Sequence, residues 1–224
     1  MTYVISDIHG NLEAFLKMLQ KIEFKDTDTL YVLGDAVDRG PDSIKCLQYI
    51  MNQPNMHMLL GNHEYMMLDV LSSPELKFFR RSWYHNGGEI TEDQFNKLSE
   101  KEQKEILDFI KGLPNSFDIT INDRRFILTH AYPEAKYYGK EYQQMNGFES
   151  ETEFVVWKRE LPPPIENGTI IFGHTPTFHY VKPASIITYK NNRYNIDCGA
   201  AYPHKGGKLG CMRLDDFKTF YVEI

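Results

Sequence analysis

The sequence predicts an α/β fold with a parallel sheet, and three observations support this. Within residues 1–71, a short apolar run followed by an amphipathic stretch occurs three times. Successive strands joined by helices pair in parallel, because parallel strands need long crossover connections. Five apolar runs along the chain each stop at an aspartate, asparagine or histidine. The length of 224 residues is enough for one large domain with a sizeable core.

The first three strand–helix units follow from apolar periodicity. Short apolar runs have the length of strands, and Leu12, Phe15, Leu16 and Leu19 recur at the spacing of one helix face. The expected elements are a strand at 3–6, a helix at 12–22, a strand at 29–33, a helix reaching residue 50, a strand at 56–60 and a helix at 62–71.

The rest of the chain predicts a helical segment and then short strands. Residues 72–111 are polar and helical in pattern, with a turn at Asn86-Gly87-Gly88, and we expect an insertion within a single domain spanning 1–224. Strands are expected at 117–121, 125–128, 169–172, 186–189, 193–196, 210–214 and 219–222. The last four should form antiparallel hairpins, because Asn191-Asn192 and Asp215-Asp216 mark turns.

Composition limits the classes of function. The formal net charge of −6 gives no basic face for sequence-independent nucleic-acid binding, and no run approaches transmembrane length. Cys46, Cys198 and Cys211 form no Cys-x-x-Cys motif, which is typical of a reducing compartment. With no leader pattern at the N-terminus, we expect a cytoplasmic protein. The oligomeric state stays open.

Side chains that can bind metal ions gather after the predicted strands. They are Asp7 and His9 in "SDIHG", Asp35, Asp38 and Arg39 in "GDAVDRG", Asn62 and His63 in "GNHE", His130 in "THA" and His174 in "GHTP". Ligands bind at the carboxyl ends of strands in open α/β sheets. Carboxylate, imidazole and amide groups suit manganese, iron or zinc, and two such ions can activate water for an in-line displacement.

Several of these residues also have a structural interpretation. Asp7 and Asn62 could cap helices, His130 and His174 could be hydrogen-bonded core histidines, and Arg39 could pair with Asp38. Any one of these interpretations is reasonable by itself. Five polar strand ends in one chain favour a shared site, because the structural interpretations would all have to hold independently.

These blocks resemble the signature motifs of the calcineurin-like metallophosphoesterases, and most closely those of the compact bacterial and bacteriophage serine/threonine phosphoprotein phosphatases. The motifs run from Asp7 to about Gly199. The resemblance implies a four-layer αββα sandwich with a dinuclear metal site at the carboxyl ends of the strands. It implies a metal-dependent phosphoric monoester hydrolase with two divalent ions, manganese first, and iron, zinc or nickel as alternatives.

The resemblance also implies a role for each residue. Asp7 and His9 would bind one metal, Asp35 would bridge both, and Asn62, His130 and His174 would bind the second. His63 would protonate the leaving group with Asp38 orienting it. Arg39 would bind phosphate, as would Arg159 in "VVWKRE". A metal-bridging hydroxide would attack phosphorus directly.

The sequence also bears on other phosphatase chemistries. A cysteine-nucleophile phosphatase needs an arginine six residues after the cysteine. The positions six residues after the three cysteines hold Asn52, His204 and Phe217, so this chemistry is excluded. Symmetrical diadenosine tetraphosphate hydrolases share nearly all the blocks but usually lack the acid at Asp38, so Asp38 favours a phosphoprotein or small phosphoester substrate. A non-catalytic scaffold that keeps the fold would have lost some of the metal-binding residues, and none is lost in this sequence. The tyrosines between Tyr132 and Tyr142 could contact substrate or simply pack.

Overall fold

The computed structural model describes residues 1–72, 77–138 and 147–224, and only the backbone of Lys77. Its elements combine two mixed β-sheets with helices, which confirms the predicted α/β class. No helix in these ranges is both long and apolar enough to cross a lipid bilayer.

The first sheet has the strand order β10-β9-β1-β2-β3. Its strands are β1 (Thr2–Ile5), β2 (Thr29–Val32), β3 (Met56–Met58), β9 (Lys208–Arg213) and β10 (Thr219–Glu223). As predicted, β1, β2 and β3 pair in parallel, and β9 and β10 form an antiparallel hairpin. The carboxyl ends of β1, β2 and β3 therefore meet at one edge.

The second sheet has the order β4-β5-β6-β8-β7. Its strands are β4 (Ser116–Ile121), β5 (Arg124–Thr129), β6 (Thr169–Phe172), β7 (Ile187–Tyr189) and β8 (Arg193–Asn195). Here β5, β6 and β8 run parallel, whereas β7 and β8 form the second predicted hairpin. This sheet also collects the carboxyl ends of three parallel strands at one edge.

The two sheets pack face to face. Val4, Leu33 and Met212 from the first sheet and its strand ends join Phe126 and Ile171 from the second in one buried apolar cluster. Apolar area removed from water is the main favourable contribution to such packing. The sandwich therefore brings the two sets of strand ends together.

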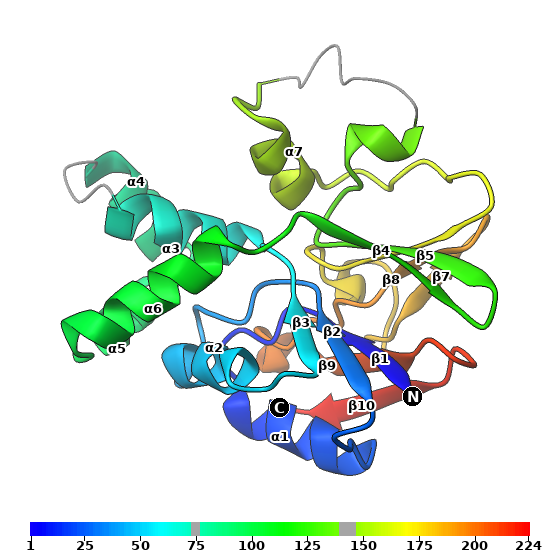
Figure 1. Cartoon of the computed structure of the whole chain (residues 1–224), viewed down its shortest axis with the longest axis horizontal. Coiled ribbons are helices and arrows are strands. Elements are labelled where there is room, and N and C mark those ends of the chain that lie inside the picture. The colour runs from blue at the N-terminus through cyan, green and yellow to red at the C-terminus, as the bar shows by residue number, and fades with distance from the viewer. Residues whose placement is uncertain (73–76, 139–146) are drawn as a thin grey trace.

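The α-helices lie outside the two sheets, most of them over the first sheet or to one side of it (Figure 1). They are α1 (Leu12–Lys21), α2 (Ser43–Met51), α3 (Asn62–Ser72), α4 (Lys77–His85), α5 (Glu89–Phe95), α6 (Glu100–Lys111) and α7 (Glu151–Trp157). Apolar residues of α1 and α2, including Phe15 and Leu47, are buried against the outer face of that sheet. Short 3₁₀ helices η1 (Ala135–Tyr138), η2 (Thr177–His179) and η3 (Pro203–Lys205) complete the elements in the described ranges.

All three cysteines are buried and unpaired. Burial raises the pKa of Cys46 and of Cys198 to about 12, and it also raises the pKa of Cys211. Thiols in such surroundings stay protonated and unreactive near neutral pH.

Candidate metal centre

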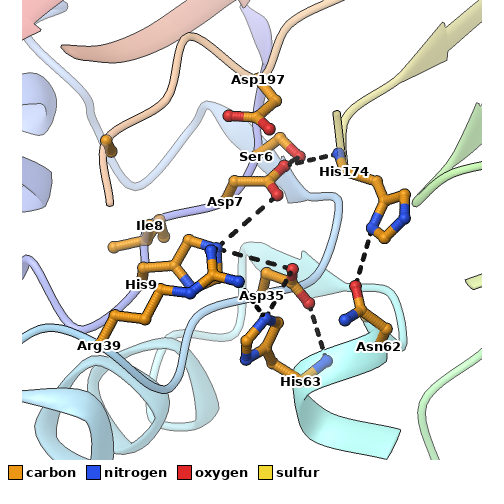
Figure 2. Close-up of polar contacts among 12 residues, drawn as sticks. Ser6, Asp7, Ile8, His9, Asp35, Arg39, Asn62, His63, His174 and Asp197 are labelled. Carbon is orange, nitrogen blue, oxygen red and sulfur yellow. Dashed lines mark hydrogen bonds and ion pairs between the residues drawn. The ribbon is translucent and has the colours of Figure 1, made fainter. Parts of the chain in front are cut away.

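The candidate site lies where the strand ends of the two sheets meet. Asp7 and His9 follow β1, Asp35 follows β2, and Asn62 and His63 are the first residues of α3 after β3. From the second sheet, His130 follows β5 and His174 follows β6. All seven side chains are buried, and Figure 2 shows six of them turned toward one another.

Asp35 is shared by two groups of potential metal ligands. One group is His9, Asp35 and His63, and the other is Asp35, His130 and His174; within each group the ligand atoms lie within 4.8 Å of one another. Asp35 Oδ2 is 3.7 Å from His9 Nε2 and 3.6 Å from His130 Nε2. One carboxylate therefore faces imidazoles from both sheets.

Asp7 and Asn62 complete these two groups. Asp7 Oδ1 lies 4.0 Å from His9 Nε2. Asn62 Oδ1 lies 2.8 Å from His174 Nδ1 and 3.0 Å from His130 Nε2. The structure thus brings together all six residues that the sequence suggested as metal ligands.

Backbone carbonyls fix the tautomers of two histidines. His9 Nδ1 is 3.0 Å from the carbonyl of Val37, and His130 Nδ1 is 2.7 Å from that of Leu33. A carbonyl only accepts hydrogen bonds, so Nδ1 carries the proton and donates in both rings. The Nε2 lone pairs then face the site, as in metal-binding histidines whose other nitrogen donates to protein.

The electrostatics of the site favour bound cations. Burial, and next the neighbouring Asp7, raise the pKa of Asp35 well above its usual value. Burial, followed by nearby positive groups, lowers the pKa of His9 and of His174 well below the usual value for histidine. A divalent cation stabilises the ionised carboxylate and binds neutral imidazole, so the donor set fits two such ions.

Several site residues have a strained backbone. The left-handed region is uncommon for residues other than glycine and costs roughly 1–3 kcal/mol each. The site residues with positive φ are Asp7, His9, Asp35, Asp38, Arg39 and His174. Strain of this kind clusters at functional sites, where surrounding contacts hold it in place.

Two glycines let the backbone pass close to the ligands. A Cβ atom on Gly61 would collide with Asp35 Oδ1, and one on Gly173 would collide with Asp7 Oδ2 and Ser6 Oγ. Glycine is therefore required at both positions for the carboxylates to keep their places.

Beside the ligands, His63 forms a buried pair with Asp38. His63 Nδ1 is 2.6 Å from Asp38 Oδ2. Thr91 Oγ1 donates to Asp38 Oδ1 at 2.6 Å, and Trp83 Nε1 donates to Asp38 Oδ2 at 2.8 Å. Because these partners donate to Asp38, the network favours an ionised carboxylate. Burial raises the pKa of Asp38 to about 7, and both hydrogen bonds oppose the shift.

The two predicted phosphate-binding arginines differ in their surroundings. The Arg39 guanidinium donates to Nε2 of His9 and to Nε2 of His63, each at 2.9 Å, and its Nε donates to the Asn86 carbonyl. Arg159 is exposed and follows α7. Arg159 lines a cavity together with Gly173, the residue before His174. Burial, followed by Arg39, lowers the pKa of His63, and the charge of Arg159 adds a smaller contribution.

Four residues that support the site were missed or left undecided by sequence reasoning. Glu64 accepts hydrogen bonds from the N–H groups of Asp35, Ala36, Val37 and Gly61, and so fixes the loop after β2. Trp83 from α4 and Thr91 from α5 donate hydrogen bonds to Asp38, although both are distant from it in the sequence. Asp197 is buried beside Asp7, as Figure 2 shows, and burial followed by Asp7 raises its pKa. Asp197 follows a predicted strand, so the strand-end rule could have found it.

The tyrosines after His130 pack in the structure where they are described. The Tyr132 ring meets Phe154 edge to face, and Tyr138 donates from its hydroxyl to the Pro163 carbonyl. Tyr137 hydrogen-bonds to Ser116 through its hydroxyl. Tyr142 lies outside the described residues.

The fold and the ligand groups together define a phosphoesterase of the metallophosphoesterase class. A family model, calcineurin-like phosphoesterase, matches residues 2–199, and the chain belongs to that family. It is 33% identical over 219 residues to serine/threonine-protein phosphatase 2 of Escherichia coli K12, covering 91% of this chain and 88% of the relative.

The chain is also similar to a relative of another named activity and to a solved structure. The chain is 42% identical over 73 residues to a symmetrical bis(5'-nucleosyl)-tetraphosphatase of Salmonella paratyphi B, which covers 32% of this chain and 26% of the relative. Its fold is similar to a solved protein serine/threonine phosphatase from Saccharomyces cerevisiae, with a TM-score of 0.61 and 15% identity, covering 100% of this chain and 79% of the other.

Proposed function

We propose that this protein is a metal-dependent phosphatase that hydrolyses phosphoserine and phosphothreonine, and also phosphotyrosine, in proteins. The observation that carries the proposal is the buried Asp38–His63 pair, in which His63 also lies next to His9 and Asp35 of the candidate metal centre. The relative with 33% identity is named a serine/threonine-protein phosphatase, which supports the same substrate class. The unpaired buried cysteines fit action in a reducing compartment, the cytoplasm.

In this proposal the ligands divide between two divalent ions, with manganese as the expected metal. Asp7 and His9 hold the first, Asn62, His130 and His174 hold the second, and Asp35 contacts both. Bound in this way, the ions would activate water and neutralise charge on the phosphate. Arg39 and Arg159 would bind phosphate oxygens, because a guanidinium matches phosphate geometry.

His63 is the proposed general acid rather than a ligand. The Nδ1 partner of His9 and of His130 is an uncharged carbonyl, whereas the Nδ1 partner of His63 is the Asp38 carboxylate. A carboxylate stabilises the imidazolium form. In the structure Arg39 donates to His63 Nε2, and burial, followed by Arg39, lowers the pKa of His63. Once Arg39 turns to the phosphate, His63 would be free to carry a proton on Nε2 and to deliver it to the leaving oxygen of serine or threonine, which leaves poorly as an alkoxide.

A second candidate is symmetrical hydrolysis of diadenosine tetraphosphate, favoured by the 42% identity to a tetraphosphatase over 73 residues. A substrate panel with Mn²⁺ separates the two. We expect higher kcat/KM on a phosphoserine peptide than on diadenosine tetraphosphate, with about two metal ions per chain. A higher kcat/KM on the dinucleotide would overturn the protein phosphatase proposal.

A further inference from the structure

A groove of about 600 Å³ lies between α3 and α4 on one side and α7 on the other. Figure 1 shows these three helices outside the two sheets. We name it the α3–α7 groove; its lining includes Tyr65 and Asp69 from α3, Phe78 and Phe79 from α4, and Glu153 and Trp157 from α7. None of these residues belongs to the metal centre described above.

Aromatic side chains form much of the groove surface. Phe78 is 80% exposed and Phe79 is 46% exposed. Large apolar side chains that are left this accessible, side by side along a groove, are typical of a binding surface. Aromatic faces also attract cations, through the negative charge above the ring.

The groove is acidic as well as aromatic. Asp69, Glu149 and Glu153 line it, and no lysine or arginine does so among the described residues. Burial, followed by Glu153 and Glu149, raises the pKa of Asp69. Glu153 also accepts a hydrogen bond from the backbone N–H of Glu149, which keeps its carboxylate beside that residue.

The groove adjoins the candidate metal centre. The Trp157 ring, which lines the groove, meets the ring of His174 at right angles with centroids 6.1 Å apart. Asp69 lies six residues after His63 on the same helix, about 9 Å along the helix axis and about 120° around it. An extended peptide covers the axial part of this separation in about three residues.

We propose that the α3–α7 groove binds a positively charged residue of the substrate polypeptide, about three residues from the phosphorylated one. This inference rests on the proposed protein phosphatase function and adds a sequence preference to it. Acidic groups and aromatic faces both attract lysine or arginine. An adenine ring could stack on the aromatic side chains, but the carboxylates would repel the polyphosphate attached to it.

The test uses phosphoserine peptides that differ at one position. Arginine, alanine or glutamate is placed at each position up to four residues on either side of the phosphoserine. We expect arginine to raise kcat/KM over glutamate about fivefold or more at one or two positions, through KM rather than kcat. Equal values for all peptides would overturn the inference and leave the proposed function intact. Failure to hydrolyse any phosphopeptide would overturn both.

Two variants assign the preference to the groove. Asp69→Asn should reduce the arginine preference, and Asp69→Lys should reverse it in favour of glutamate. Asp26→Asn serves as the matched control, because Asp26 is an exposed carboxylate in the turn between α1 and β2, far along the chain from the groove. Turnover of p-nitrophenyl phosphate should be unchanged in all three. An arginine preference that survives Asp69→Lys, with normal p-nitrophenyl phosphate turnover, would overturn the assignment.

Discussion

His63 Nδ1 lies 2.6 Å from Asp38 Oδ2, and both side chains are almost completely buried. Two further helices fix the pair, because Trp83 of α4 and Thr91 of α5 also donate hydrogen bonds to Asp38. Rigid positioning of this kind is what a proton donor needs, since proton transfer requires hydrogen-bond distance to the leaving atom.

Replacing the proposed acid should have an effect that depends on the leaving group. We expect His63→Asn to lose about 10²–10⁴-fold in kcat on a phosphoserine peptide, the usual size of general acid catalysis. The loss on p-nitrophenyl phosphate should be smaller, because nitrophenolate leaves without a proton. Steady-state kinetics on both substrates measures the difference.

Metal content separates this effect from damage to the site. His63→Asn should keep its metal ions, measured by elemental analysis, and His57→Asn, at an exposed position of β3, should behave as the parent protein. Near-parental turnover of the phosphoserine peptide by His63→Asn would remove His63 from the mechanism.

The hydroxyl of Thr91 should matter for both stability and turnover. It donates to Asp38 Oδ1 and accepts from the Asp38 backbone N–H. Thr91→Val keeps the shape but leaves these buried groups without a partner, which should lower the free energy of unfolding by about 1–3 kcal/mol. We expect a lower free energy of unfolding in urea and a lower kcat on the phosphoserine peptide. Thr91→Ser restores the hydroxyl and should recover most of each, and a Val variant equal to the Ser variant would contradict this account.

Asp35 should be the residue on which metal binding depends most. Its Oδ2 atom lies within 4.0 Å of Nε2 of His9, His63 and His130. Asp35→Asn removes the negative charge that both proposed ions share, so we expect loss of both ions and of activity. Elemental analysis after equilibration with Mn²⁺ measures this, with Asp26→Asn as the control. Two ions retained in Asp35→Asn would exclude the bridging role.

The strand ends could be found from sequence because their signal is local. An apolar run that stops at Asp7 or His130 is visible in a few residues, and parallel strands bring such ends to one edge. The bonds from Trp83 and Thr91 to Asp38 have no local signal, because they connect residues 45 and 53 positions apart through tertiary packing. The order of strands in the second sheet is likewise set by packing between distant segments.

Helix α7 was not predicted from the sequence, for a different reason. Ser150 and Glu153 have the spacing of a helix N-terminus signal, and the Ser150 hydroxyl does accept from the Glu153 N–H. The helix was missed because it has only seven residues, which leaves little apolar periodicity to detect. Its consequence is functional, because α7 supplies Trp157 beside His174 and Glu153 in the α3–α7 groove.

The acidic groove predicts a pH dependence of peptide selectivity. Asp69 is faced by Tyr65 on its own helix and by Glu149 and Glu153 from the α7 side, whereas the described α4 residues in the lining, Phe78, Phe79 and Ser82, do not titrate. Because the pKa of Asp69 is raised, its carboxylate is protonated at a higher pH than an ordinary aspartate. The negative charge, and with it the preference for arginine, should therefore be lost as the pH falls.

Binding measures this more cleanly than turnover, because the metal centre also titrates. The peptides carry a non-hydrolysable phosphonate in place of phosphoserine, with arginine or alanine at the preferred position. We expect the ratio of the alanine-peptide Kd to the arginine-peptide Kd to fall toward one as the pH is lowered from 7 to about 4, where even an ordinary aspartate begins to be protonated, and to be low and flat in Asp69→Asn. A leucine-versus-alanine pair at the same position should give a ratio that does not change with pH. An arginine preference that stays constant over this range in the parent protein would show that the Asp69 carboxylate does not supply the attraction.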